Sequence, residues 1–230
     1  MRHTALKFCG FTQATPIAQA IALGVEAIGL VFYPPSPRAV TPEQASDLVK
    51  VIPPFVTVVA LVVNMGELDL QNLAKNVAFD VIQFHGDETA KQCQNLAKSV
   101  QKRWYKALRV KDSDTTASLN AQIDELKTCG ASAVLLDAYH ADKFGGTGEQ
   151  FDWDKIPKNA SLPIILAGGL TADNVGEAIQ QTGVYGVDVS GAIERAKGQK
   201  DLAKMQEFVI SVKTKDITKL TDKEILAKVM

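Results

Sequence analysis

The sequence has few cysteines and no long apolar run. Its 230 residues include three cysteines, Cys9, Cys93 and Cys129, which form no CxxC pair and have no neighbouring pair of histidines. This spacing excludes a disulfide framework and a zinc-finger type of site, and it predicts reduced thiols in a cytoplasmic protein. The longest apolar run, Phe55 to Val63, is too short to span a bilayer and is typical of a buried strand. The first residues show no secretory signal pattern.

The chain also lacks an excess of basic charge. Lysine and arginine total 25 and aspartate and glutamate total 26, for a formal net charge of -1. Without a basic field, nucleic acid and anionic membrane are not expected as partners. No Walker motif is present, and no G-x-G-x-x-G follows the first apolar run, which argues against an NTPase and a dinucleotide-binding fold.

What the sequence does contain is a regular alternation of short apolar runs and helix-like segments. The runs recur about every 22 to 30 residues, the rhythm of parallel β-α units. Eight such units predict one (β/α)8 barrel over residues 1–212, with 213–230 as an appended C-terminal helix or tail. A doubly wound open sheet is the alternative, disfavoured by the missing nucleotide motif. The eight expected strands are 5–8, 27–32, 55–63, 80–84, 104–108, 133–136, 162–166 and 186–189.

Two helix starts have recognisable capping residues. Thr12 precedes a helical segment from Ala14 to Leu23, so its hydroxyl is expected to cap that helix. Thr41 followed by Pro42 predicts the start of the helix that follows the second expected strand.

Polar residues gather where the expected strands end, which is where barrels of this kind hold their chemistry. These strand ends would converge in space although they are scattered in the chain. The residues concerned are Cys9, Arg38, His85, Asp137, Gly168, Gly169, Asp188, Ser190 and Gly191.

Cys9 ends the first expected strand and is followed by Gly10. It is interpreted as a general base, a nucleophile or a small buried apolar residue, and its place at a strand end favours a chemical role. Lys7 shares its strand face, about 7 Å away by the period of two. Its ammonium either favours the Cys9 thiolate or pairs with a carboxylate inside the barrel.

Asp137 ends the sixth strand and is interpreted either as a general acid or as a turn or cap residue. A general acid must stay partly protonated, which desolvation can achieve. The following loop contains Gly145-Gly146-Thr147-Gly148, which either forms a mobile lid or simply permits a turn.

Gly168-Gly169 and Ser190-Gly191 close the seventh and eighth strands, the usual phosphate position in such barrels. Glycine lets backbone N–H groups approach an anion, so a phosphate ester is favoured over ligand-free tight turns.

Arg38, in a proline-rich loop, is either a solvated charge or a fork for a substrate carboxylate. His85 is peripheral, since a lone histidine at a strand end is more often structural.

Seven motifs in chain order resemble the phosphoribosylanthranilate isomerase family, from residue 7 to about residue 194. They are Lys7-Phe8-Cys9-Gly10-Phe11-Thr12, Ser36-Pro37-Arg38, Gln83-Phe84-His85-Gly86-Asp87-Glu88, Leu136-Asp137, Gly145-Gly146-Thr147-Gly148, Leu166-Ala167-Gly168-Gly169-Leu170 and Val187-Asp188-Val189-Ser190-Gly191. Phe8 and Phe11 depart from the smaller aliphatics common there.

The resemblance implies a cofactor-independent aldose–ketose isomerase of tryptophan biosynthesis that uses no metal. It implies Cys9 as the base, Asp137 as the acid and Arg38 as the contact for the anthranilate carboxylate. Phosphate would bind around Gly168, Gly169, Ser190 and Gly191, with Asp188 and His85 also at the substrate. The expected partner is a phosphorylated small molecule, in a monomer or homodimer.

Two other functions stay open. An indole-glycerol-phosphate or aminoimidazole-carboxamide type of barrel enzyme is one, although the latter typically has an aspartate where this chain has Cys9. A non-catalytic phosphate-binding protein is the other, and it would not need both Cys9 and Asp137.

Overall fold

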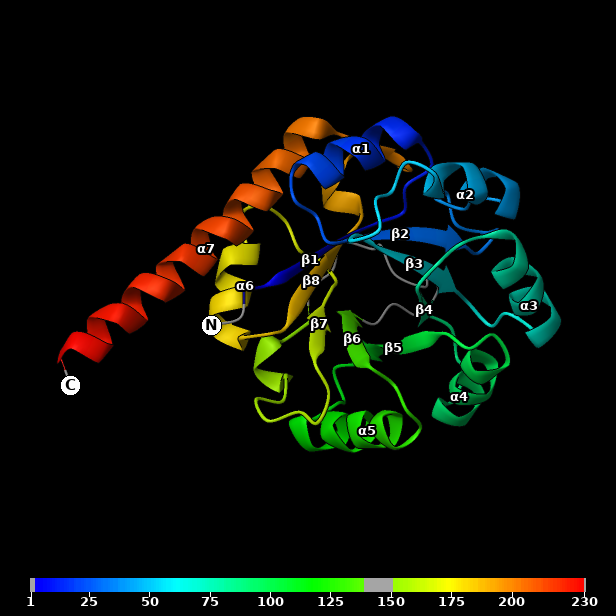
Figure 1. Ribbon diagram of the computed structural model, residues 1–230. Coiled ribbons are helices and arrows are strands. Elements are labelled where there is room, and N and C mark those ends of the chain that lie inside the picture. The colour runs from blue at the N-terminus through cyan, green and yellow to red at the C-terminus, as the bar shows by residue number, and fades with distance from the viewer. Residues whose placement is uncertain (1–2, 139–150, 230) are drawn as a thin grey trace.

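The computed structural model describes residues 3–138 and 151–229, with side chains described as far as residue 216. Within these residues, eight parallel strands hydrogen-bond in chain order and close into a barrel, because the first strand pairs with the eighth. The predicted (β/α)8 barrel is therefore confirmed (Figure 1). The strands are β1 Ala5–Cys9, β2 Ala27–Phe32, β3 Thr57–Val62, β4 Val81–Phe84, β5 Arg103–Val110, β6 Ala133–Ala138, β7 Ile164–Leu166 and β8 Gly186–Val189.

Helices surround the barrel, as Figure 1 shows. Thr41 caps α2 through a capping box with Gln44, as predicted. Between β6 and β7 the described residues contain the 3-10 turn η1, Trp153–Lys155. The helices are α1 Ala14–Ala22, α2 Pro42–Val49, α3 Glu67–Asn76, α4 Ala90–Ser99, α5 Thr116–Thr128, α6 Val175–Thr182 and α7 Leu202–Val229.

The strands present apolar side chains to the helices and a mixed set to the barrel interior. On β1, Phe8 is fully buried and packs edge-to-face on Phe208 of α7, with ring centroids 5.9 Å apart. Burying a side chain of this size contributes roughly 1.5–3 kcal/mol. Since side chains alternate along a strand, Lys7 and Cys9 point into the barrel. A second cluster of buried apolar side chains, separate from the main core, includes Val59, Tyr105 and Leu135.

Two local predictions were wrong, and one element was not predicted. Thr12 does not cap α1: Gln13 occupies the N-cap position, and the Thr12 hydroxyl donates to the Gly198 carbonyl at 3.0 Å. Phe55 is 99% exposed, and β3 begins only at Thr57. The sequence also gave no warning of the hairpin β9 Glu194–Ala196 and β10 Gln199–Lys200, which follows the 3-10 turn η2, Gly191–Ile193.

The C-terminal helix is a single element that runs past α6 and α1 and then away from the barrel (Figure 1). It continues without a break through residue 212, where the sequence predicts the end of the barrel. Asp216 on this helix accepts hydrogen bonds from the backbone N–H and the hydroxyl of Thr4, both at 2.8 Å. These contacts fix the start of the chain against α7. The division of domains at 212 stays a prediction.

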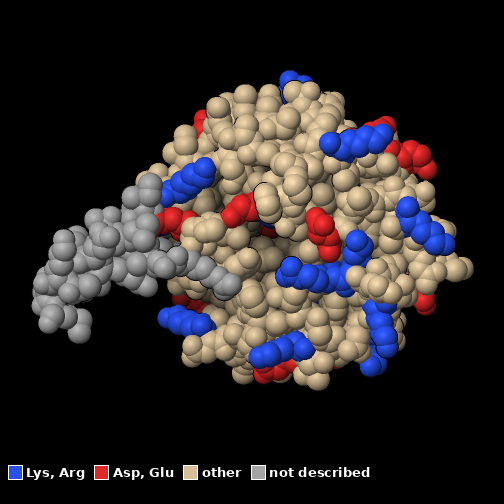
Figure 2. Space-filling view, in the orientation of Figure 1, with Lys and Arg blue, Asp and Glu red and all other residues tan. Residues whose placement is uncertain are grey.

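Basic and acidic side chains are interspersed over the face shown in Figure 2, in keeping with a net charge of -1. Within the described part of the chain, no helix combines the length and apolar character needed to cross a membrane.

Candidate active site

A cavity of about 640 Å³ opens at the carboxyl ends of the strands. Cys9 from β1 and Asp137 from β6 line it together, so the thiol and the carboxyl share one chamber. All nine residues singled out from the sequence line this cavity: Cys9, Arg38, His85, Asp137, Gly168, Gly169, Asp188, Ser190 and Gly191.

Cys9 is buried, with 5% of its surface exposed, and it is tightly held. A Cβ at Gly29 on the neighbouring strand would lie 2.6 Å from its sulfur, so only glycine leaves room there. Its carbonyl accepts a hydrogen bond from the Ser190 hydroxyl at 2.9 Å, which ties the end of β1 to the end of β8. The thiol thus has a fixed place in the cavity wall.

Lys7 pairs with a carboxylate inside the barrel, one of the two roles predicted for it, and its effect on the Cys9 thiolate stays a prediction. Its ammonium pairs with Asp188 on β8, Nζ to Oδ2 2.8 Å, and both side chains are buried. Burial raises the pKa of the Cys9 thiol, and the positive charge of Lys7 opposes that rise without cancelling it. The net direction is therefore upward, and Lys7 limits the cost of forming the thiolate rather than making it the resting form.

We expect iodoacetamide to alkylate Cys9 with a titration midpoint above the ordinary thiol value of about 8.5. Lys7→Met should move the midpoint further up, because it removes a charge that favours the thiolate. Asp188→Asn should move it down, since the charge of Asp188 acts to raise the pKa of Cys9. Peptide mapping by mass spectrometry separates Cys9 from Cys93 and Cys129, and an unchanged midpoint in Lys7→Met would remove Lys7 from this role.

Asp137 ends β6 and is 5% exposed. Its Oδ1 accepts a hydrogen bond from the N–H of Ala138 at 2.9 Å, and its Oδ2 lies 3.3 Å from Nε2 of His85. Gly168 backs the carboxyl: its φ is +79°, and a Cβ there would lie 2.7 Å from Oδ1. The carboxyl is therefore held between a backbone donor, an imidazole and a glycine turn.

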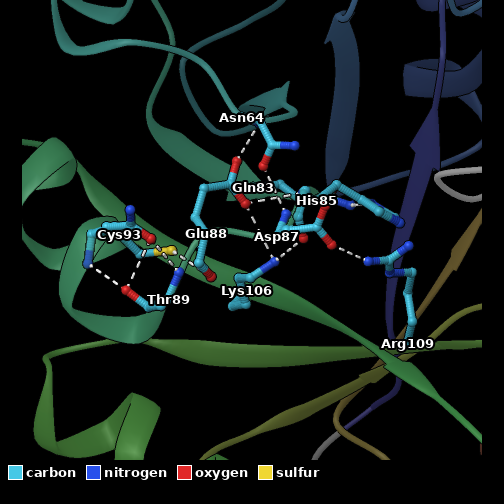
Figure 3. A network of polar contacts seen from close by, with 11 residues as sticks. Asn64, Gln83, His85, Asp87, Glu88, Thr89, Cys93, Lys106 and Arg109 are labelled. Atoms are coloured by element: carbon cyan, nitrogen blue, oxygen red, sulfur yellow. Dashed lines mark hydrogen bonds and ion pairs between the residues drawn. The ribbon is translucent and has the colours of Figure 1, made fainter.

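His85 makes a contact that its sequence position did not reveal. Instead of standing alone at a strand end, its ring lies between Asp137 and Gln83. Nε2 of Gln83 is 2.9 Å from Nδ1 of His85 (Figure 3). Gln83 is fully buried and also lines the cavity. In the sequence, Gln83 stands out only as part of the Gln83–Glu88 motif, and nothing there indicates that its side chain reaches the site.

The loop after β4 is anchored by a second polar cluster, also drawn in Figure 3. Lys106 on β5 donates to the carbonyl of Gly86 at 2.7 Å and lies 3.4 Å from the Glu88 carboxylate. Glu88 in turn accepts from the N–H groups of Asn64 and Gly86. This cluster fixes the backbone beside His85.

Arg38 is held at the cavity by a partner that the sequence did not suggest. Its Nε and Nη2 donate to the two carboxylate oxygens of Glu194, each at 2.8 Å. Lys200 donates to the same carboxylate at 2.8 Å. Burial acts to raise the pKa of Glu194, but hydrogen bonds from Arg38 and the charge of Lys200 bring it below its ordinary value. One carboxylate thus orients two cations.

Two glycine-bearing turns line the cavity. Gly168 and Gly169 both lie in the left-handed region, with φ of 79° and 62°. Ser190 and Gly191 also line the cavity, together with Lys197 from the β9–β10 turn. Lys197 is a cation that sequence reasoning missed, because nothing in the sequence indicated this hairpin.

Three features remain: the glycine-rich loop after β6, the other two cysteines, and groups that could bind a metal. The loop at Gly145–Gly148, expected either as a mobile lid or as a plain turn, lies outside the described residues. Cys93 and Cys129 do not line the cavity, and Cys93 is a core residue whose pKa burial raises to about 12. Among the residues that the structure describes, no group of three or more histidine, cysteine and acidic side chains is placed to hold a metal ion.

A closed parallel barrel with an acid, a thiol and glycine turns at its carboxyl end defines a (β/α)8-barrel enzyme of the acid–base class. A family model described as N-(5'phosphoribosyl)anthranilate (PRA) isomerase matches residues 6–211. Proteins named N-(5'-phosphoribosyl)anthranilate isomerase from Nitrosococcus oceani and Acinetobacter calcoaceticus are 49% and 47% identical over 210 residues. These alignments cover 91% of this chain and 98% and 97% of the relatives. This chain belongs to the N-(5'-phosphoribosyl)anthranilate isomerase family.

Solved structures support the same grouping. The phosphoribosyl anthranilate isomerase of Thermotoga maritima superimposes with a TM-score of 0.81 at 28% identity, over 92% of this chain and 99% of that one. Another isomerase of this name, in complex with reduced 1-(o-carboxyphenylamino)-1-deoxyribulose 5-phosphate, gives 0.75 at 27% identity over the same shares. The family model ends at residue 211, so most of α7 extends beyond it.

Proposed function

We propose that this chain isomerises N-(5-phosphoribosyl)anthranilate to 1-(2-carboxyphenylamino)-1-deoxyribulose 5-phosphate in tryptophan biosynthesis. The observation that carries this proposal is that Cys9 and Asp137, from strands on different sides of the barrel, line one cavity with Arg38 and the two glycine turns. This gives the pair of proton-transfer groups that an aldose–ketose isomerase requires. Membership of the family indicates which substrate to propose.

In the proposed mechanism Asp137 acts first, as the general acid. It protonates the furanose ring oxygen while the C1–O bond breaks, and the anilino nitrogen supplies electrons to form an iminium at C1. Asp137 is suited to this role because Ala138 N–H and His85 can stabilise the carboxylate that remains.

Cys9 then acts as the general base. Its thiolate removes the proton from C2, the electrons of that C–H bond form the C1–C2 double bond, and the iminium nitrogen is neutralised. The resulting enolamine tautomerises to the ketone. Because burial raises the pKa of Cys9, the step depends on the opposing charges of Lys7 and Lys200, which favour the thiolate.

Substrate binding uses the charged rim and the turns. We assign the anthranilate carboxylate to Arg38. Arg38 lines the cavity, and its guanidinium is held in place by Glu194. We assign the phosphate to the backbone of Gly168, Gly169 and Gly191 and to Ser190. Lys197 adds a positive charge on that side. Groups held at two ends of the substrate fix the reacting carbons between acid and base.

His85 and Asp188 complete the proposed substrate-binding set, since both line the cavity. Asp188 has one buried oxygen, Oδ1, without a hydrogen-bond partner within the described structure. A ribosyl hydroxyl would satisfy this acceptor.

The setting of the enzyme follows from the same features. All three cysteines are free, which supports the cytoplasm as the compartment. A dimeric phosphoribosylanthranilate isomerase is known from Thermotoga maritima, and for this chain we propose a monomer or a homodimer acting on a phosphorylated small molecule, with no nucleic-acid partner.

The function is tested by adding purified protein to the fluorescent anthranilate ribotide. The proposal expects fluorescence to fall with time and with enzyme concentration. A protein that only binds phosphate ligands would gain thermal stability with the ribotide but would not make its fluorescence fall any faster. That result would refute the proposal.

Arg38→Ala should raise KM roughly ten- to hundred-fold with kcat within about threefold, since a charge-assisted hydrogen bond to a substrate carboxylate contributes about 1.5–3 kcal/mol. Steady-state kinetics measure both constants. Arg195→Ala is the matched control, because Arg195 follows Glu194 on β9, is exposed and does not line the cavity. A loss confined to kcat would contradict a binding role for Arg38.

A further inference from the structure

Next to Asp137 lies a chain of polar side chains, His85, Gln83 and Tyr105, of which Gln83 and Tyr105 have no part in the proposed mechanism. The Tyr105 hydroxyl donates to Oε1 of Gln83 at 2.8 Å. Nε2 of Gln83 is 2.9 Å from Nδ1 of His85, and Nε2 of His85 is 3.3 Å from Oδ2 of Asp137. Tyr105, His85 and Asp137 are each about 5% exposed and Gln83 is fully buried, so neighbouring side chains must supply their hydrogen-bond partners.

The direction of this chain of contacts is set at its far end by Tyr105. A tyrosine hydroxyl has a single hydrogen, and Tyr105 donates it to Oε1 of Gln83. This fixes Oε1 of Gln83 as the acceptor and leaves its Nε2 hydrogens for His85.

The orientation of Gln83 in turn determines where His85 carries its proton. An amide N–H facing Nδ1 requires that nitrogen to be an unprotonated acceptor, so a neutral ring is protonated at Nε2. The Nε2–H then faces Asp137. With the amide reversed, Nδ1 would carry the hydrogen and the Nε2 lone pair would face Asp137 at 3.3 Å, which is repulsive once Asp137 has become a carboxylate.

The backbone leaves His85 little other freedom. Its N–H donates to the Val62 carbonyl at 2.8 Å, and the next residue, Gly86, is held by Lys106 at its carbonyl and by Glu88 at its N–H. Figure 3 shows Lys106 and Glu88 beside His85. With the backbone fixed, only the rotation and the tautomer of the imidazole ring depend on the neighbouring side chains.

We propose that Gln83 and Tyr105 are positioning residues that hold His85 as the neutral tautomer protonated at Nε2, so that His85 donates to Asp137. The inference rests on the proposed function for its kinetic part only. Nε2 of His85 has no hydrogen-bond partner of good geometry within the described structure, although Asp137 is 3.3 Å away. The contact is thus loose before reaction and is able to tighten as the carboxyl gives up its proton.

Such a contact acts on the rate more than on binding. An N–H donor interacts more strongly with a carboxylate than with a carboxylic acid, so it favours the state in which Asp137 has transferred its proton. The ground-state complex gains little. A KM that stays constant while kcat falls is therefore the kinetic signature of losing the correct tautomer.

The tautomer is measured directly by NMR of protein labelled with ¹⁵N-histidine. The chain has three histidines, so few ring signals appear, and those of His85 are identified by their loss in His85→Asn. The wild type should show Nε2 protonated and Nδ1 unprotonated near neutral pH. This readout does not depend on turnover, so it stands or falls separately from the proposed function. Protonation at Nδ1 in the wild type would overturn the inference.

Gln83→Glu is the sharpest variant, because it keeps the shape and removes the donor. A carboxylate at 83 can accept from both Tyr105 and His85, so Nδ1 of His85 should become protonated. We expect kcat to fall roughly ten- to hundred-fold with KM within threefold. The same change at an exposed site, Gln180→Glu on α6, is the control and should alter neither constant.

Tyr105→Phe provides a second variant that removes only a hydroxyl. Without it, Gln83 can rotate, and the His85 signals should show both tautomers with a smaller fall in kcat.

If Gln83→Glu does not fold, Tyr105→Phe alone tests the positioning role. Unchanged His85 signals in the variant that folds, or a fall in kcat without any change of tautomer, would refute the positioning role. An inactive wild type with the expected tautomer would instead refute the proposed function.

Discussion

Cys9→Ser is expected to reduce kcat by about 10²- to 10⁴-fold, the contribution of a well-placed acid–base group. A serine hydroxyl ionises far less readily than a thiol, and the barrel interior makes any anion at this position more costly. The side chain is nearly the same size, and its neighbours, Gly29 and the Ser190 hydroxyl on the Cys9 carbonyl, are unaffected. The fold should therefore be retained while the base is lost.

The fluorescence assay measures this loss, and thermal unfolding followed by circular dichroism checks the fold. Cys129→Ser and Cys93→Ser are the matched controls, since neither cysteine lines the cavity. Both should keep kcat within about threefold of the wild type. Cys9→Ser with kcat within tenfold of the wild type would remove Cys9 from the mechanism.

Asp137→Asn should cause a loss of similar size, about 10²- to 10⁴-fold in kcat, because an amide cannot donate the proton that opens the ring. The substitution is isosteric, and its carbonyl oxygen can still accept from Ala138 N–H. Its amide hydrogens would face Nε2 of His85, so the variant also tests whether that imidazole can change its tautomer to accept.

Single-turnover kinetics distinguish loss of chemistry from loss of binding for this variant. Asp47→Asn, at an exposed residue paired only with Lys50, is the control and should behave like the wild type. We expect the ribotide to bind Asp137→Asn with near-normal affinity and to persist. Turnover within tenfold of the wild type would show that another group supplies the proton.

The positions of the site residues along the chain were predictable because of barrel geometry. Parallel strands in a closed barrel place all their carboxyl ends at one rim, so a residue that ends a strand is also a residue at the site. Cys9 and Asp137 could thus be brought together from sequence although 128 positions separate them, and one cavity does contain both. Interior alternation likewise placed Lys7 on the face of Cys9.

The partners of these residues could not be predicted in the same way. Glu194 and Lys200 belong to a short hairpin after β8 that has no period-two apolar pattern, and together they orient Arg38. Thr12 shows the related failure, since a tertiary contact with the Gly198 carbonyl at this hairpin took the hydroxyl that local capping would have used. Phe55 was included in a strand because hydrophobicity does not report which apolar side chain stays in water.

By itself, the sequence determined the barrel, its strand order and the identity of the groups at its rim, because periodicity and strand ends are properties of local chain order. Only the tertiary structure decided the hydrogen-bond partners of those groups: Asp188 for Lys7, Glu194 for Arg38, and Gln83 for His85. The reason is physical. A polar atom removed from water must find a partner among whatever side chains the folded chain brings within about 3 Å, and that choice depends on packing between strands that are distant in sequence.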